Sequence, residues 1–409
     1  MKKIIKTIFF ICLALDAAIF VAVYFLGSNI AQSYSVTKGD FLQIDSFLPV
    51  TAEYSDAKKS NTTKTGDTFE VDLKMFGVIP FSRTQVKIVD EMQVAVLGNP
   101  FGMKIYTDGV LVIDLSDVNT KSGKQNPAKS AGIKIGDYIK SVNGKKITCN
   151  EDLSNAVIGS FGKEMKFKII RESKEFTAIV KPVLDGETGV YRAGIWVRDS
   201  SAGIGTLTFY CPSTNVICGL GHGICDNETG SLLNIDYGEM VSADITSVKK
   251  SESGKPGELK GKFTFDTVAN IDLNSKIGVY GQLNGKIDIS NLTKVALKQE
   301  IKNGKAQILC TVDGDRPKLY SCEIKKRNTS ENELTQNLLV TITDEKLLAK
   351  TGGVVQGMSG SPILQNGKLV GAVTHVLIDD PTKGYAIFAE NMLETAQSVA
   401  ESNSLKDAS

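Results

Sequence analysis

The second half of the chain limits the possible folds most strongly. From Asp185 onward, for about 200 residues, short strand-like runs alternate with glycine, asparagine and aspartate turns. Ile204–Cys211, Ile277–Tyr280 and Leu338–Thr341 are examples, and the first convincing helical period comes only at Phe388–Ala400. The 38 glycines against 10 prolines also fit a protein with many tight turns. The pattern predicts a β-barrel or sandwich that is closed by a terminal helix.

Length and charge narrow the possible functions. A chain of 409 residues is long enough for two or three domains. Its 47 basic and 46 acidic residues nearly balance, whereas phosphate binding needs a basic excess or a concentrated basic face. We therefore expect no nucleic-acid partner.

The N-terminus has the pattern of a membrane segment. Three lysines lie within the first six residues, and the apolar run over residues 4–27 is close to the ~20 residues that a helix needs to cross a bilayer. The basic end should stay in the cytoplasm, so the remaining chain should be exported. A cleavable signal peptide is the alternative, but its apolar region is usually only ~7–15 residues long. We predict an uncleaved signal anchor over residues 1–30, interrupted by Asp16.

Residues 31–92 carry no recognisable chemistry. The stretch Tyr54–Gly66 is rich in Ser, Thr, Lys and Asp, and Thr68–Lys74 alternates like a strand. We predict a stalk with a small irregular segment.

Residues 93–184 contain an ordered motif, Ala131-Gly-Ile-Lys-Ile-Gly-Asp-Tyr-Ile-Lys-Ser-Val-Asn-Gly144. The Gly136-Asp137 turn reverses the chain into a buried strand, and Asn143-Gly144 supplies the positive φ angles of a tight hairpin. The motif resembles the AGL-x-x-GD-x-I-x-x-(V/I)-NG stretch of bacterial PDZ domains, so we predict a PDZ-like domain here.

This resemblance implies a peptide-binding strand. PDZ domains add a peptide to a sheet edge, beside a glycine-containing loop that offers its N–H groups. Gly102, Met103 and Ile105 occupy the equivalent place and are the predicted peptide-binding residues. The alternative is a rigid spacer that binds nothing.

The sharpest chemical signal is Gly357-Met-Ser359-Gly-Ser-Pro362, which a turn and the strand Leu369–His375 follow. A serine can react only if a tight turn presents its hydroxyl while backbone N–H groups point at one spot. The segment resembles the G-x-S-G-G-P loop of chymotrypsin-like serine peptidases. Ser359 is the predicted nucleophile, and the Gly357 and Ser359 N–H groups form the predicted oxyanion hole.

Only two histidines are available as the general base. His222 lies in a glycine-flanked turn after a strand, from which an imidazole can reach across a cleft, and it precedes the serine as in the chymotrypsin template. We predict His222 as the base and His375 as a wall or support of the specificity pocket. The alternative is two ordinary structural histidines.

Cysteines near His222 raise the question of a metal site. Cys218 and Cys225 flank this histidine, but C-x3-H-x2-C is not a familiar zinc pattern and a second ligand pair is missing. We expect buried or paired thiols here, and neither a metal ion nor another cofactor.

The third catalytic residue is harder to assign. Asp226, Asp344, Asp379 and Asp380 are the candidates. We choose Asp344, which ends a strand before the nucleophile loop and could fix the tautomer of the base. Its place only fifteen residues before Ser359 departs from the chymotrypsin layout, in which the aspartate lies far upstream.

Taken together, the anchor, the PDZ segment, the His222 turn and the Ser359 loop resemble the stage IV sporulation protein B peptidases of endospore-forming bacteria. The resemblance implies a peptidase domain over 185–403 with Asp344 as the third catalytic residue. It also implies export from the forespore inner membrane into the intermembrane space, and self-cleavage near the N-terminus. The implied substrate is a membrane-bound inhibitor complex that restrains an intramembrane metalloprotease controlling a late sigma factor. The alternative is a non-catalytic PDZ scaffold with a peptidase-like barrel.

Overall fold

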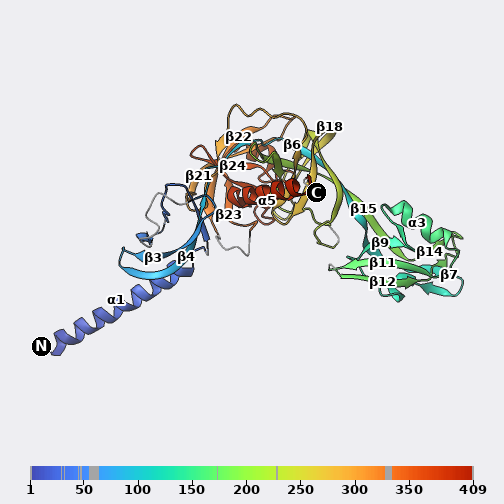
Figure 1. Cartoon of the computed structure of the whole chain (residues 1–409), viewed down its shortest axis with the longest axis horizontal. Helices are drawn as coiled ribbons and strands as arrows, with labels where there is room; N and C mark the ends of the chain where they lie inside the picture. Colours follow the sequence, from blue (N-terminus) through green and yellow to red (C-terminus); the bar gives the residue numbers. More distant parts are fainter. Residues whose placement is uncertain are drawn as a thin grey trace.

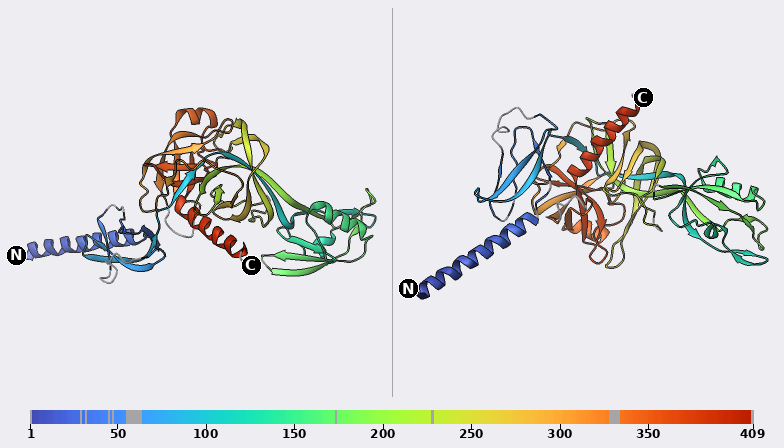
Figure 2. Two further views of the ribbon diagram at one scale, coloured as in Figure 1. Left: turned by 45° about the horizontal axis from the view of Figure 1, so that its top comes forward. Right: turned by 60° about the horizontal axis from the view of Figure 1, so that its bottom comes forward.

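A computed structural model shows that the protein is mainly β, as the sequence predicts. It describes residues 2–407 except 29, 32, 45, 47, 55–63, 173, 227–228 and 328–333. A helix and a small sheet lie at one end, a large β body with the C-terminal helix lies in the middle, and a smaller β domain lies at the other end (Figure 1). The two further views show the same order along the molecule (Figure 2).

The N-terminal segment forms one helix, α1 (Lys2–Ser28). Apolar side chains such as Phe9, Phe10 and Phe20 are exposed along it. Within the described part of the chain, however, no helix is long and apolar enough to span a membrane. The membrane anchor predicted over residues 1–30 is thus not shown by the structure.

Residues 31–92 contain a folded sheet where a stalk with a small irregular segment was predicted, and the strand expected at Thr68–Lys74 is part of this sheet. Four strands pair in the order β1-β4-β3-β2, with β1 parallel to β4. Alternate residues of β3 turn inward, so that Phe69, Val71 and Leu73 pack with Val86 and Ile88 into a separate core. The strands are β1 (Ser33–Thr37), β2 (Val50–Glu53), β3 (Thr68–Met75) and β4 (Ile79–Val89).

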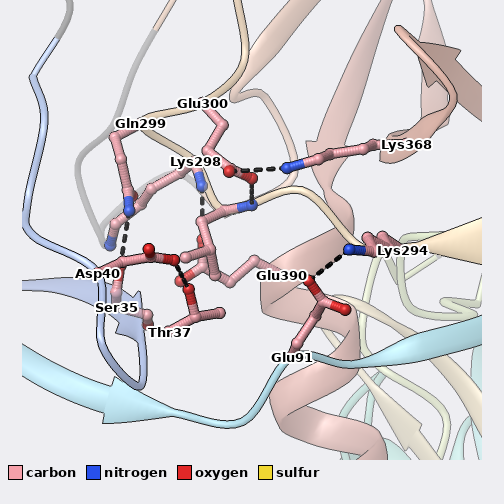
Figure 3. Close-up of polar contacts among 11 residues, drawn as sticks. Ser35, Thr37, Asp40, Glu91, Lys294, Lys298, Gln299, Glu300, Lys368 and Glu390 are labelled. Atoms are coloured by element: carbon pink, nitrogen blue, oxygen red, sulfur yellow. Dashed lines mark hydrogen bonds and ion pairs between the residues drawn. The ribbon is translucent and has the colours of Figure 1, made fainter.

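This N-terminal sheet contacts the large β body through β1 (Figure 3). The Gln299 side-chain amide donates to the Ser35 carbonyl over 2.6 Å, and the Lys298 ammonium lies 5.5 Å from the centre of the Tyr34 ring. The Lys298 backbone N–H in turn donates to Glu390 over 2.6 Å. The segment that holds the sheet is thus bonded to the C-terminal helix.

The first half of the large body is a ring of strands. The pairings run β6-β17-β18-β19-β16-β15 and return to β6, while β5 and β20 extend from β15. Side chains such as Phe101, Leu207 and Val279 fill the interior. The strands are β5 (Gln93–Val96), β6 (Pro100–Leu115), β15 (Ile195–Cys211), β16 (Val216–Gly219), β17 (Ile235–Lys249), β18 (Glu258–Ser275), β19 (Gly278–Leu283) and β20 (Thr293–Lys294).

The PDZ-like domain is inserted between two strands of this first barrel. β6 leaves the barrel to enter the domain, and β15 returns antiparallel beside it. The sequence predicted that the PDZ-like domain is a contiguous segment with boundaries at 92/93 and 184/185. The structure differs, because β6 and β15 each belong to both the barrel and the PDZ-like domain. The other elements are β7 (Val118–Thr120), β8 (Gly123–Gln125), α2 (Pro127–Ser130), β9 (Tyr138–Val142), β10 (Lys145–Lys146), α3 (Asn150–Gly159), β11 (Met165–Arg171), β12 (Lys174–Val180), β13 (Val183–Leu184) and β14 (Tyr191–Arg192).

The second half is a closed barrel in the order β21-β22-β23-β26-β25-β24. Helix α4 (Glu345–Thr351) precedes the Ser359 loop, and α5 (Ala389–Asp407) is the terminal helix that the sequence predicts. Met392 and Ala396 of α5 are fully buried against the body. The strands are β21 (Gly304–Cys310), β22 (Lys318–Lys326), β23 (Leu338–Ile342), β24 (Pro362–Gln365), β25 (Lys368–Val376) and β26 (Lys383–Phe388).

Candidate active site

The Ser359 loop leads into β24 of the second barrel and packs against the first barrel. Gly360 has a φ of +94°, and a Cβ there would overlap the Thr206 carbonyl oxygen of β15 and meet the Leu220 backbone nitrogen. Only glycine allows this approach. The loop therefore lies directly against the turn that carries His222.

Two buried threonines of β15 hold the loop in place. The Thr206 N–H donates to the Ser359 carbonyl over 2.9 Å, and its hydroxyl donates to the Gly357 carbonyl over 2.8 Å. The Thr208 hydroxyl donates to the Gly360 carbonyl over 2.7 Å. Neither threonine was predicted from the sequence. Two hydroxyls at alternate positions of an otherwise apolar, buried strand were nevertheless a signal, since buried polar groups need partners.

The backbone around Ser359 offers two free donors. Gly357 has a φ of +97°, and within the described residues neither its N–H nor that of Ser359 donates to another group. The same two N–H groups are the predicted oxyanion hole. Unpaired donors beside a serine are what an oxyanion hole requires.

His222 follows β16 on a left-handed turn. Leu220 and Gly221 have φ angles of +68° and +67°, and such a conformation is rare for a leucine. The Nδ1–H of His222 donates to the Gly223 carbonyl over 2.9 Å, which leaves Nε2 as the ring atom able to accept a proton. Desolvation by burial lowers the pKa of His222 below its usual value of 6.5, so the neutral form dominates at pH 7.

His375, on β25, lies beside the predicted base. The centres of the two imidazole rings are 4.7 Å apart and the ring planes differ by 32°. Desolvation, followed by the charge of His222, lowers the pKa of His375 to about 4. His375 is thus a neutral neighbour of the base at pH 7, and its predicted role in a specificity pocket stays a prediction.

The loop of Ser359 and the turn of His222 both border one residue, Thr374. The Ser359 hydroxyl donates to the Thr374 carbonyl over 2.7 Å, and a Cβ at Gly221 would lie 3.1 Å from the Thr374 methyl carbon. The segments that carry the two catalytic candidates, 137 positions apart in sequence, are therefore neighbours in the structure. In this arrangement the hydroxyl proton of Ser359 points at a carbonyl rather than at His222.

Asp344, the predicted third catalytic residue, has other partners in the structure, and its catalytic role stays a prediction. It caps α4, where one carboxylate oxygen accepts from the N–H groups of Lys346 and Leu347 over 3.0 Å each. The other oxygen accepts from the Ser321 N–H over 3.3 Å. Among the described residues, no hydrogen bond or ion pair joins Asp344 to either histidine.

The other acidic candidates have different partners. Asp226 forms a buried ion pair with Arg198, and its carboxylate accepts from the Thr229 N–H over 2.8 Å. Asp380 pairs with Lys383 over 2.8 Å. In the described part of the chain, the hydrogen-bond partner of His222 is thus a backbone carbonyl and not a carboxylate.

The predicted peptide-binding residues also need correction. Gly102, Met103 and Ile105 lie in the barrel half of β6, where β15 pairs with one edge and β17 with the other. A peptide cannot add to a strand whose two edges are already paired. The sequence could not reveal this, because both partner strands lie about a hundred residues away or more.

The described cysteines are free thiols. Cys218 is buried and Cys225 is exposed, and burial raises the pKa of both. Within the described residues, no three histidine, cysteine or acidic side chains are grouped so that they could hold a metal ion.

Comparison with protein families identifies the region that carries this site. The family described as SpoIVB peptidase S55 matches residues 189–393, which is half of the chain. The chain belongs to this peptidase family. The match confirms the resemblance seen in the sequence and covers both Ser359 and His222. A second match, to the PDZ domain family, spans residues 95–181 and confirms the PDZ-like domain.

Similar individual proteins match only parts of the chain. The regulator of sigma-W protease RasP of Bacillus subtilis is 27% identical over 194 residues, which cover 46% of this chain and 38% of RasP. The Lactococcus lactis protein LL2128, which has a zinc metalloprotease name, is 41% identical over 73 residues, or 18% of this chain and 16% of that protein. The matches thus span well under half of these relatives.

Solved structures show low overall similarity. The PDZ domain of the SdrC-like protein Lmo2051 of Listeria monocytogenes has a TM-score of 0.19 and 21% identity, over 22% of this chain and 87% of that one. An inactive form of Rv3671c of M. tuberculosis has a TM-score of 0.24 and 13% identity, over 49% and 82% of the two chains.

Proposed function

We propose that this chain is a serine endopeptidase in which Ser359 is the nucleophile and His222 the general base. The observation that carries the proposal is that the Ser359 loop, with two unpaired N–H groups, and the turn of His222 come together at Thr374. The Gly223 carbonyl holds the His222 tautomer that leaves Nε2 free, and Asp344 stays the proposed third catalytic residue. The neutral ring suits a base, since its lowered pKa keeps it unprotonated at pH 7.

The proposed reaction has two steps. Ser359 Oγ turns from the Thr374 carbonyl toward His222, gives its proton to Nε2 and bonds to the scissile carbonyl carbon, while the Gly357 and Ser359 N–H groups hold the developing oxyanion. The protonated His222 then gives its proton to the leaving amine as the C–N bond breaks. Water, deprotonated by His222, hydrolyses the acyl-enzyme and restores Ser359. One oxyanion donor contributes roughly 3 kcal/mol to such a transition state.

We further propose a role in sporulation signalling, at the forespore inner membrane facing the intermembrane space. The proposed substrates are the chain's own N-terminal region and a membrane-bound inhibitor of an intramembrane metalloprotease that controls a late sigma factor. Residues 4–27 would hold the protein at the membrane. The family assignment, the exposed apolar side chains of α1 and the matches to two proteins named as proteases support this role.

A non-catalytic PDZ scaffold is the second candidate. Two features favour it: the Ser359 hydroxyl donates to the Thr374 carbonyl, and among the described residues no carboxylate is hydrogen-bonded to His222. It differs from the peptidase in one measurable property, because a scaffold has no activated serine.

Labelling with a fluorophosphonate separates the two candidates. The wild type is expected to be labelled and to yield a fragment shortened at the N-terminus, which mass spectrometry of the purified chain would detect. Ser359→Ala should lose both signals, while Ser361→Ala, a change at a buried serine two positions away, should keep them. Equal labelling of wild type and Ser359→Ala would exclude Ser359 as the nucleophile, and an unlabelled wild type would favour the scaffold.

A further inference from the structure

The sheet of the PDZ-like domain is extended by a strand that returns to the barrel. Its order is β12-β11-β9-β6, and the remaining edge of β6 pairs antiparallel with the start of β15. In this register Val197 lies opposite Val112, and Arg198 lies opposite Leu111. Figure 1 shows β15 running from the PDZ-like domain into the central body.

The start of β15 also lies beside the helix of the domain. Helix α3 packs against β14 and β15, and its first N–H, of Asn150, donates to the Asp199 carboxylate over 2.8 Å. Ile195 and Val197 turn inward onto the domain core, whereas Trp196 is 60% exposed. An extended segment that adds to a sheet edge and fills the neighbouring pockets with alternate side chains is how PDZ domains bind peptides.

We propose that the PDZ-like domain binds residues 195–198 of its own chain as its peptide, and that this internal contact aligns the Ser359 loop through β15. An external peptide could add to this edge of β6 only after residues 195–198 had left it. The domain therefore acts as an internal brace of the peptidase.

The same strand reaches both catalytic loops. At its far end Thr206 and Thr208 hold the carbonyls of the Ser359 loop. Near its start Arg198 forms the buried ion pair with Asp226, which lies four positions after His222. Release of residues 195–198 would break the ion pair of Arg198. It would also leave the part of β15 that contains Thr206 and Thr208 no longer anchored at the PDZ-like domain. This last step, from the brace to catalysis, rests on the proposed function.

A peptide-binding experiment on the full chain tests the internal ligand. The probe is a fluorescein-labelled peptide with the sequence of residues 193–200, and binding is measured by anisotropy. Val197→Asp places a carboxylate against the apolar core of the domain and should free the groove, so this variant should bind the probe at least ten-fold more tightly than the wild type. Trp196→Gln is the matched control, because it changes the neighbouring, exposed side chain and should bind like the wild type.

Deuterium exchange shows whether the variant keeps its fold. In Val197→Asp, exchange should rise at residues 111–115 and 195–198 while β9 and β11 stay protected. If β9 and β11 also lose protection, Val197→Asp has disrupted the domain, and Val197→Thr is used in its place. Val197→Thr keeps the shape of valine and should bind the probe several-fold more tightly than the wild type. Equal binding of the probe to the wild type and to the variant that keeps its fold would overturn the internal ligand.

The rate of fluorophosphonate labelling tests the alignment of the Ser359 loop. Val197→Asp should be labelled about ten-fold more slowly than the wild type, because small displacements of oxyanion donors are costly. An unchanged rate in a variant that binds the probe would overturn the alignment while leaving the internal ligand intact. If the wild type is not labelled, the peptidase proposal is refuted. The peptide-binding result then still decides whether residues 195–198 are the internal ligand.

Discussion

Thr206 is the residue whose role depends least on the identity of the substrate. It is 1% exposed, and its hydroxyl and N–H hold the carbonyls of Gly357 and Ser359, whose own N–H groups form the proposed oxyanion hole. Because a peptide unit is planar, these two bonds fix the units that also contain the Met358 and Gly360 N–H groups, on either side of the Ser359 N–H. The Thr206 hydroxyl, on the Gly357 carbonyl, therefore supports the turn that presents Ser359.

Replacement of this hydroxyl should affect the rate more than substrate binding. Thr206→Val keeps the shape and the backbone bond but removes the hydrogen bond to Gly357, and a lost bond of about 1 kcal/mol corresponds to roughly a five-fold lower kcat. KM should stay near the wild-type value. Thr206→Ser, which restores the hydroxyl, should recover most of the activity. Steady-state kinetics on a peptide substrate would measure this, and a Thr206→Val kcat equal to wild type would refute the role.

The two histidines predict how stability depends on pH. Burial lowers the pKa of both rings, for His375 to about 4 from an unfolded value of 6.5. The unfolded chain therefore binds more protons than the folded one between these values, and stability should fall as the pH drops from 6.5 toward 4. Urea unfolding at pH 7.0 and pH 4.5 should show that the free energy of unfolding falls less between these pH values for His375→Asn than for the wild type. An equal fall in the free energy of unfolding for both proteins would argue against burial of the two histidines as the cause.

The same lowered pKa affects catalysis. His222 must be neutral to accept the Ser359 proton, so the acid limb of kcat/KM should have its midpoint below 6.5, the ordinary value for histidine. A pH profile on a peptide substrate would measure this midpoint. A value above 6.5 would indicate a charged partner for His222, such as a carboxylate that reaches the ring in an active arrangement.

Asp344, the predicted third catalytic residue, is also the cap of helix α4. Asp344 directly follows β23 and precedes the nucleophile loop, which suits a catalytic acid, but the N-terminal N–H groups of a helix also need an acceptor, and aspartate is a preferred one. In the structure the cap accounts for both of its carboxylate oxygens together with the Ser321 N–H.

Variants of Asp344 separate the cap from a catalytic role. Asp344→Ala should lower the free energy of unfolding by about 1 kcal/mol, while Asp344→Asn, an equally good cap, should unfold like the wild type. If the residue acts only as a cap, Asp344→Asn should also keep its activity within a few-fold. Urea unfolding and fluorophosphonate labelling would measure both properties. Unchanged stability with a loss of activity by orders of magnitude would restore Asp344 to the catalytic group.

The whole molecule is organised around an inserted domain. The two strands that enter and leave the PDZ-like domain are neighbours in the barrel, with Tyr106 opposite Ser200. Adjacent entry and exit points are what allow one domain to be inserted into another without breaking the host core.

Removal of the inserted domain should therefore leave a foldable barrel. Replacing residues 107–199 by an Asn-Gly turn would join Tyr106 to Ser200 as a two-residue hairpin. The shortened chain should unfold in one cooperative transition, as measured by circular dichroism in urea. A control that also deletes Ser200 shifts the pairing by one residue and should not fold, because such a shift turns every side chain of the strand to the other face. A shortened chain without a cooperative transition would contradict the insertion.

Features that depend on a few neighbouring residues were determined by the sequence alone. The Asn143-Gly144 turn has φ angles of +51° and +82°, as a tight hairpin requires, and the glycines of the Ser359 loop have the positive φ angles that its motif implies. The PDZ-like domain and the peptidase family were identifiable for the same reason, since each motif specifies its own backbone. The mainly β character followed from alternation and turn residues over short windows.

Contacts between distant segments were decided only by the tertiary structure. Gly102 and Ile105 look like a free peptide-binding strand until β15 and β17 pair with both of its edges. The bond from the Ser321 N–H to Asp344 joins two distant segments, and Thr206 shows its role only when the Ser359 loop packs on it. The physical reason is that turns and caps are set by bonds within a few residues, whereas the partner of a strand edge or a buried hydroxyl can come from anywhere in the chain.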